Sequence, residues 1–194
     1  MKNVLKISLA VALFFSALTA MANGNALSLR VRTGVGKLVN FSIDDEKSVM
    51  ISISSEDKEV IFSETLRSKD GKINRTYDLA SFPDGVYYLE AETGAKVAKY
   101  EVTIANNGVI VGDKAVAEVS KPVLAKKDGF VMVSVPDNGK APAAIRMYDE
   151  NNVELYTGTV KGTKKFDVNN TAAKNITVIL EYNDRTFVET IAAR

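Results

Sequence analysis

The sequence predicts an all-β protein built from β-sandwiches that follow an N-terminal signal peptide. Apolar and polar residues alternate with a period of two through many short segments, which is typical of strands with one buried face. Turns rich in glycine, proline, asparagine and aspartate separate these segments. Beyond the signal peptide, no long segment keeps the apolar stripe of an amphipathic helix. This pattern favours a sandwich over alternating strands and helices.

The first residues have the three parts of an export signal. Lys2 and Lys6 give a basic start, residues 5–18 form an apolar run, and Ala20-Met21-Ala22 is a small-x-small cleavage site. The run is shorter than the ~20 residues that span a bilayer as a helix. We therefore expect residues 1–22 to be removed and the remaining chain to be exported, to the periplasm or outside the cell, without a membrane span.

Ten segments of the mature chain have the composition of strands. They are residues 27–32, 49–54, 60–66, 86–92, 97–104, 130–135, 144–148, 153–160, 176–182 and 186–191. The turn signals between them are residues 70–71, 83–85, 92–94, 137–139 and 151–152. Many short strands with such spacing are typical of a sandwich.

An approximate internal repeat suggests that two such units follow one another. Residues 49–53, Val-Met-Ile-Ser-Ile, recur as Val-Met-Val-Ser-Val at 131–135. Two further matches pair residues 88–91 with 179–182, and residues 102–104 with 189–191. Each copy has about the size of a small immunoglobulin-like domain.

We predict two tandem immunoglobulin-like β-sandwich domains. The first covers residues 26–105, a polar linker covers 106–113, and the second domain covers 114–194. The alternative is one continuous sandwich of about 14 strands.

Composition excludes several kinds of chemistry. The chain has no histidine, cysteine or tryptophan, so Ser-His-Asp and Cys-His catalysis and metal sites with imidazole or thiolate ligands are excluded. Without Lys2 and Lys6, the 25 basic residues become 23 against 24 acidic ones. This near-neutral balance gives no electrostatic reason to expect a nucleic acid as partner. We expect no cofactor and no enzyme activity.

A family resemblance appears near the end of the first copy. Residues 79–89, Leu-Ala-Ser-Phe-Pro-Asp-Gly-Val-Tyr-Tyr-Leu, are followed by Lys-Tyr-Glu-Val-Thr-Ile at 99–104. This pair resembles the closing hairpin of the type IX (Por) secretion C-terminal sorting domain, in which a Pro-x-Gly-Val-Tyr turn leads into the penultimate strand. The resemblance implies an immunoglobulin-like sandwich of an exported protein. It lies here in the middle of the chain.

Two short motifs have catalytic or cofactor-binding counterparts. Residues 55–58, Ser-Glu-Asp-Lys, match Ser-x-x-Lys, but they lie between two expected strands and not on a helix. Residues 34–36, Gly-Val-Gly, begin like a dinucleotide-binding loop, but Val39 replaces the third glycine. We interpret both as turns between strands.

Acidic clusters are the remaining candidates for metal binding or hydrolysis. Residues 44–46, Asp-Asp-Glu, and Asp149 with Asn151 and Glu154 lack the six to eight oxygen ligands that calcium requires, so we interpret them as turns and expect no metal site. A histidine-free hydrolase with two carboxylates stays open as an alternative, although no pair is marked by the sequence.

Tyrosines are the candidate ligand-contacting residues. We single out Tyr87, Tyr88 and Tyr148 as aromatics for a sugar or protein partner. Tyr87 and Tyr88 are consecutive in an expected strand, so they face opposite sides and only one belongs to the core. Four asparagines begin the Asn-x-Ser/Thr triplets that accept glycans in hosts that make them: Asn40, Asn74, Asn169 and Asn175. In other hosts they are ordinary turn and strand residues.

These observations favour a non-catalytic exported protein that acts through its surface. It would be an adhesion, cell-envelope or secretion-linked component, with a protein or polysaccharide at the cell surface as partner. The alternatives are a carbohydrate- or protein-binding module and a periplasmic chaperone that donates a strand. An unpaired long edge strand at the domain junction would indicate the chaperone.

Overall fold

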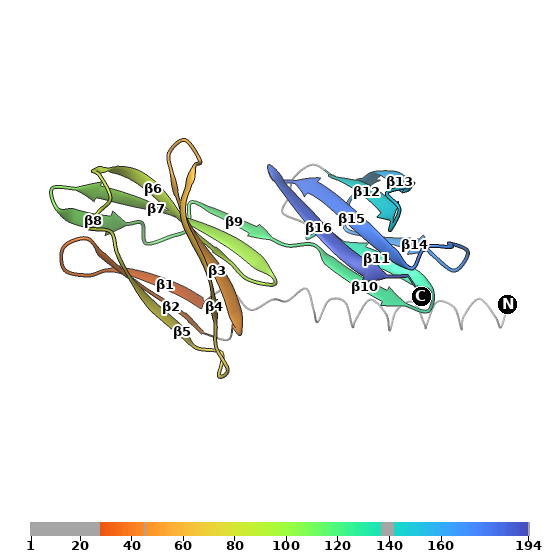
Figure 1. Ribbon diagram of the computed structural model, residues 1–194, viewed down its shortest axis with the longest axis horizontal. Helices are drawn as coiled ribbons and strands as arrows, with labels where there is room; N and C mark the ends of the chain where they lie inside the picture. The colour runs from red at the N-terminus through yellow and green to blue at the C-terminus, as the bar shows by residue number, and fades with distance from the viewer. Residues whose placement is uncertain (1–27, 45, 137–141, 194) are drawn as a thin grey trace.

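The protein is all-β in the computed structural model, which describes residues 28–44, 46–136 and 142–193. These residues form antiparallel strands and turns without a helix (Figure 1). It follows that no helix among them is long and apolar enough to cross a membrane. The predicted signal peptide, residues 1–22, lies outside the described residues.

Residues 28–120, which we call the N-terminal region, form two sheets. The three-stranded sheet has the order β1-β2-β5, with β1 at Ser28–Thr33, β2 at Leu38–Asp44 and β5 at Ile73–Asp78. The larger sheet has the order β4-β3-β6-β7-β8, and β9 also pairs with β7. Its strands are β3 (Ser48–Ser55), β4 (Val60–Arg67), β6 (Gly85–Glu92), β7 (Lys96–Ala105), β8 (Gly108–Val111) and β9 (Ala117–Ser120).

Residues 123–193, the C-terminal region, repeat this arrangement. One sheet is β10-β11-β14, with β10 at Val123–Lys127, β11 at Phe130–Ser134 and β14 at Thr163–Asp167. The other is β13-β12-β15-β16, with β12 at Ala143–Asp149, β13 at Glu154–Val160, β15 at Asn175–Tyr182 and β16 at Arg185–Ala192. In both regions the first, second and fifth strands face the fourth, third, sixth and seventh.

Each pair of sheets encloses its own hydrophobic cluster. The N-terminal cluster contains Val39, Phe41 and Ile43 of β2 together with Ile51 of β3. The C-terminal cluster contains residues of β11, β12 and β15, among them Ile145. Alternation produces this burial, because every second residue of these strands points between the sheets.

Among the described residues, polar contacts join the N-terminal and C-terminal regions. Arg185, at the start of β16, forms an ion pair with Glu90 of β6. Tyr182, at the end of β15, donates a hydrogen bond from its hydroxyl to the carbonyl oxygen of Ser120. The β15–β16 hairpin therefore touches the N-terminal region through side chains beside its turn.

The all-β prediction is confirmed, and the strands expected from clear alternation are present. Strands with weak alternation were missed, and β5 is an example, because only Ile73 and Tyr77 of its six residues are buried. Residues 106–113, expected to be a linker, contain β8, and the N-terminal sheet continues to Ser120 through β9. The domain bounds stay a prediction.

One match of the internal repeat pairs strands that are not equivalent. Residues 49–53 lie in β3, the third strand of its region, whereas residues 131–135 begin in β11, the second strand of the other region. The matches between β6 and β15 and between β7 and β16 join equivalent strands. The two segments also differ in burial, because it alternates along residues 49–53, whereas Val131, Met132 and Val133 are all buried.

Candidate functional site: the outer face of the β1-β2-β5 sheet

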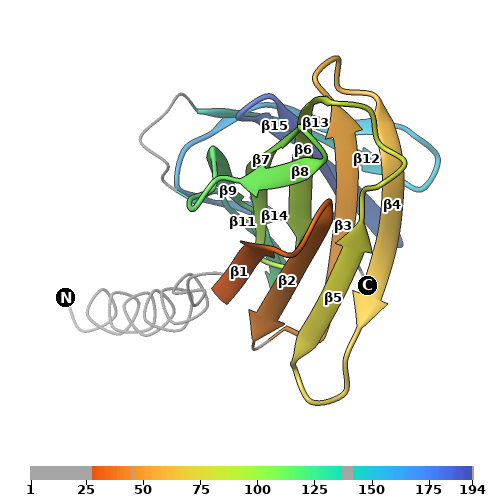
Figure 2. The same cartoon turned by 90° about the vertical axis from the view of Figure 1, so that its left-hand side faces the viewer.

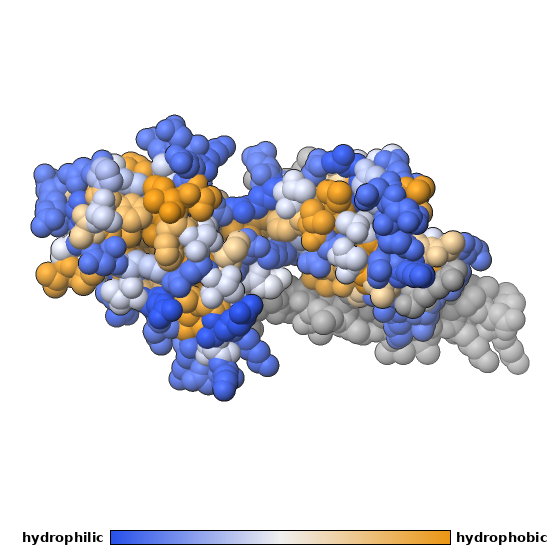
Figure 3. All heavy atoms as spheres, viewed as in Figure 1, coloured by the Kyte–Doolittle hydropathy of each residue, from blue (hydrophilic) through white to orange (hydrophobic). Residues whose placement is uncertain are grey.

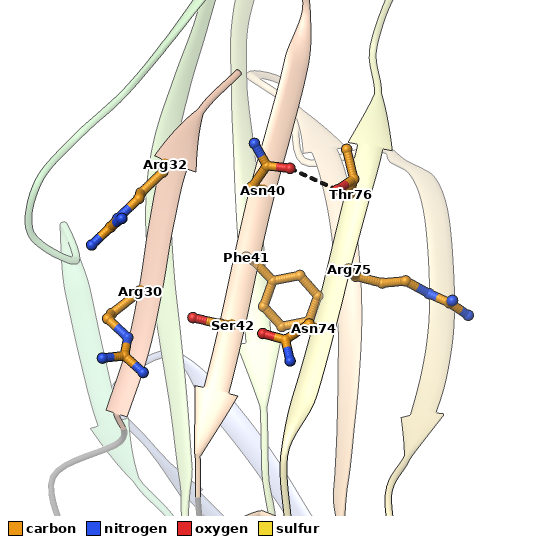
Figure 4. Close-up of a pocket in the computed structure, with 8 residues that line it drawn as sticks. All are labelled: Arg30, Arg32, Asn40, Phe41, Ser42, Asn74, Arg75 and Thr76. Atoms are coloured by element: carbon orange, nitrogen blue, oxygen red, sulfur yellow. Dashed lines mark hydrogen bonds between the residues drawn. The ribbon is translucent and has the colours of Figure 1, made fainter. Parts of the chain in front are cut away.

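A shallow hollow of about 720 Å³ lies on the outer face of the β1-β2-β5 sheet (Figure 4). Its lining is mostly polar and includes three arginines: Arg30, Arg32, Asn40, Phe41, Ser42, Asn74, Arg75 and Thr76. Six of these residues form what we call the polar face: Arg30, Arg32, Asn40, Ser42, Asn74 and Thr76.

The register of the sheet places the polar face in two rows. Arg30 pairs with Ser42, and Ser42 pairs with Asn74. Arg32 pairs with Asn40, and Asn40 pairs with Thr76. Since side chains two residues apart point to the same side of a strand, both rows lie on one surface.

The floor of the hollow belongs to the core. Phe41 lies between Asn40 and Ser42 in β2, is only 2% exposed, and stacks on Tyr77 with ring centroids 5.9 Å apart. The outward side chains therefore stand on a strand whose opposite side is anchored by an aromatic pair.

One hydrogen bond orients the middle of the polar face. The Thr76 hydroxyl donates to the side-chain oxygen of Asn40 over 2.6 Å, across the β2–β5 pair. The amide nitrogen of Asn40 points away from Thr76 in Figure 4. This nitrogen is a donor available to a ligand.

The three arginines of the hollow are in different electrostatic environments. Arg30 forms an ion pair with Asp44, at the end of β2. Arg75 points away from the hollow in Figure 4, and its Nε lies 3.6 Å from Oε1 of Glu64. Arg32 forms no ion pair with any described residue and is exposed. Arg32 is therefore the arginine of the hollow that is open to an anion.

Glu64 also ties the two sheets of the N-terminal region together. It accepts a hydrogen bond from the hydroxyl of Tyr77 over 2.7 Å. Burial, helped by this bond, raises the pKa of Tyr77. Figure 2 shows β4 and β5 side by side at this edge.

The predicted ligand-contacting tyrosines do not gather at one site. Tyr87 is 7% exposed, and its hydroxyl donates to the carbonyl oxygen of Pro83 over 3.0 Å. This is the geometry of a tyrosine corner, a structural feature of immunoglobulin-like sandwiches. Tyr88 is half-buried beneath Lys99, whose Nζ lies 3.9 Å from its ring centroid, and Tyr148 lies in β12 of the other region. Ligand contact by these tyrosines stays a prediction.

The other motifs lie in turns. Residues 55–58 form the tip of the β3–β4 hairpin, where Lys58 donates its backbone N–H to Ser55. Residues 34–36 join β1 to β2, and Gly36 has a positive φ of 67°.

Neither acidic cluster is assembled as a metal site in the described residues. Asp149 accepts backbone N–H groups of Asn151 and Val153, each over 2.8 Å, and so closes a turn. Asp45, the middle residue of the other cluster, lies outside the described residues. Among the described residues there is no group of three acidic side chains that could hold a metal ion.

Two carboxylates of the described residues have perturbed pKa values, and both lie in turns. A hydrogen bond from the Ser68 hydroxyl is the main cause that lowers the pKa of Asp70. Hydrogen bonds from backbone N–H groups, first that of Glu150 itself and then those of Asn175 and Lys174, lower the pKa of Glu150. The general acid of a glycosidase requires the opposite shift.

The polar face was not predicted from the sequence, although one signal for it was present. The two triplets that begin at Asn40 and Asn74 each place polar residues at positions i and i+2, which share one side of a strand. Arg30 and Arg32 follow the same rule in β1. What the sequence does not show is that β2 pairs with both β1 and β5.

No protein-family model matches the chain, and no curated protein matches its sequence. Among solved structures, the chain is similar to one described as "Biofilm associated protein - BSP domain", with 13% sequence identity and a TM-score of 0.28. The match covers 84% of this chain and 29% of that one, so the chain spans less than a third of its length.

Proposed function

We propose that the chain is an exported, non-catalytic protein that binds a partner at the cell surface through the polar face. One observation carries the proposal: six hydrogen-bonding side chains from three strands surround a hollow on one surface. A rigid sheet holds these groups before a ligand arrives, which lowers the entropic cost of binding. The N-terminal sequence supports the export part of the proposal.

The polar face is suited to binding and not to bond cleavage. The arginine side chains donate hydrogen bonds, and the asparagine, serine and threonine side chains donate and accept them. Among the described residues, neither the Ser42 nor the Thr76 hydroxyl is hydrogen-bonded to a carboxylate that could activate it; Thr76 donates to Asn40. The lowered pKa values of Asp70 and Glu150 leave the two-carboxylate hydrolase without a candidate acid in these turns.

The strand-donating chaperone has less support. Such a protein needs an open sheet edge at the junction of its two regions. In the N-terminal region, β7 pairs there with β9, and further along with β8. Exposed apolar residues such as Val60 and Ile61 do occur at the β4 edge. On the side seen in Figure 3, hydrophobic residues are scattered among hydrophilic ones and do not form one large patch.

The proposal is tested by export and by adhesion. First, the producing cells are fractionated, and the termini of the protein are determined by mass spectrometry. We expect the chain outside the cytoplasm, starting at Asn23. Recovery of the uncleaved chain in the cytoplasm would contradict export.

Second, adsorption of the purified protein to washed cells is compared with that of the double variant Arg32→Gln/Asn74→Ala. We expect the variant to bind at least fivefold more weakly, because two groups of the polar face are removed. Arg67→Gln is the matched control, since it removes an exposed arginine at the end of β4 that does not line the hollow. Equal adsorption by all three proteins would contradict a role for the polar face.

A further inference from the structure

We propose that the polar face binds an acidic polysaccharide, with Arg32 and Arg30 contacting carboxylate groups and the asparagine, serine and threonine side chains contacting sugar hydroxyls. This inference rests on the proposed function and names its ligand class.

The carboxylate sites follow from the geometry of β1. Arg30 and Arg32 are two residues apart on one side of the strand, which places their Cα atoms roughly 6.7 Å apart. A planar guanidinium matches a carboxylate with two parallel hydrogen bonds. Two such groups along one strand suit a chain that carries its charges at intervals, and Arg32 has no described acidic neighbour to compete with it.

The remaining residues of the polar face suit hydroxyl groups. A sugar hydroxyl both donates and accepts hydrogen bonds, and so do side-chain amides and hydroxyls. Asn40, Ser42, Asn74 and Thr76 provide four such groups beside the arginines. The Thr76–Asn40 hydrogen bond holds one amide in a single orientation, which favours a ligand with a defined pattern of hydroxyls.

The same surface is poorly suited to a protein partner. Protein interfaces are anchored by buried aromatic and aliphatic side chains. The one aromatic residue lining the hollow, Phe41, is 2% exposed and belongs to the core. The polar face therefore favours a hydrated ligand over an apolar peptide.

Asp44 is the group that opposes an acidic ligand. Its carboxylate pairs with Arg30, so a ligand carboxylate must share or displace it. Replacing Asp44 by asparagine removes this competition and lowers the negative charge near the polar face. Asp44→Asn is therefore expected to strengthen binding of an acidic ligand. A general loss of structure would weaken binding instead.

The test measures binding of the purified protein to three immobilised polymers at moderate salt: polygalacturonate, neutral dextran and poly-L-glutamate. We expect binding to polygalacturonate, with weak or no binding to the other two. Arg32→Gln is expected to weaken it about tenfold and Asp44→Asn to strengthen it about threefold. Two controls match these charge changes away from the hollow: Arg67→Gln at the end of β4, and Glu101→Gln on the outer side of the larger sheet.

The outcomes separate this inference from the proposed function. Equal binding to poly-L-glutamate and polygalacturonate, or equal effects of the controls, would overturn the ligand class in favour of general polyanion adsorption. Tight binding to dextran would overturn the role of the carboxylates. Absence of polygalacturonate binding, while adsorption to cells still depends on Arg32 and Asn74, would overturn the inference and leave the proposed function standing. Circular dichroism of each variant shows whether it is folded.

Discussion

The two three-stranded sheets have the same strand order but carry different residues on the side away from their cores. In the β1-β2-β5 sheet, the side away from the core carries arginine, asparagine, serine and threonine. In the β10-β11-β14 sheet, the corresponding side carries the exposed Phe130 and the buried Met132, paired with Asp167 and Lys165 of β14. The shared architecture therefore does not determine binding, because the outward positions are free to vary once the inward ones fill the core.

The largest predicted effect tests whether the two cores are independent. Ile51 and Ile145 occupy equivalent strands and are almost completely buried. Truncating either to alanine is expected to cost about 2–5 kcal/mol in the region that contains it. Hydrogen exchange of peptides from each region measures this. If each substitution destabilised both regions equally, the continuous sandwich would be favoured over two domains.

A smaller effect distinguishes two glycine turns. An added Cβ at Gly129 would lie 1.9 Å from Oδ1 of Asn169, and φ is positive there at 76°. Gly36 also has a positive φ, but nothing lies within 4 Å of its Cβ position. We expect Gly129→Ala to cost about 2–3 kcal/mol and Gly36→Ala about 1 kcal/mol.

Denaturant unfolding of the two alanine variants provides the comparison. Equal losses of stability would show that the Asn169 side chain moves aside without cost.

The hydrogen bond of the tyrosine corner gives Tyr87 a larger expected role in stability than its neighbour Tyr88. Tyr87→Phe removes the hydrogen bond to Pro83 and is expected to lower the free energy of unfolding by about 1 kcal/mol. Tyr88→Phe is the control, because its hydroxyl has no hydrogen bond to a described residue; its expected change is below about 0.5 kcal/mol. Thermal unfolding of both variants gives the result. A larger loss for Tyr88→Phe would contradict the structural role of Tyr87.

The smallest effect concerns alkaline pH. Burial raises the pKa of Tyr182 from 10.0 to about 12. Folding therefore favours the neutral phenol, and this contribution to stability is present below pH 10 and is lost as pH rises through about 12. Tyr182→Phe is expected to flatten the decline of stability in this interval. An unchanged decline, measured by denaturant unfolding at several pH values, would contradict the burial of this hydroxyl.

The sequence predicts the strands with clear alternation correctly, but it does not predict the polar face. Residues 49–53 and 86–92 alternate clearly and form β3 and β6, because burial on one side of a strand leaves a direct trace in the sequence. The turn before Tyr87 leads into β6 as its composition indicated. β5 left a weaker trace, because the outward residues Asn74 and Thr76 and the edge residue Arg75 are all polar.

The polar face was not predictable because it depends on which strands pair. Arg32, Asn40 and Thr76 become neighbours only after β2 pairs with β1 on one side and with β5 on the other. Tyrosines were predicted to contact a ligand because aromatic rings often bind sugars. In Tyr87 the same ring serves the core, and no local pattern distinguishes these two uses.

The most direct test of the account maps the ligand on the protein. Backbone amide shifts of the isotopically labelled protein are recorded by NMR during titration with short galacturonate oligosaccharides. The shifted resonances are expected to cluster in β1, β2 and β5, around Arg32, Asn40 and Thr76. Shifts confined to the C-terminal region, around Tyr148 or Phe130, would contradict it.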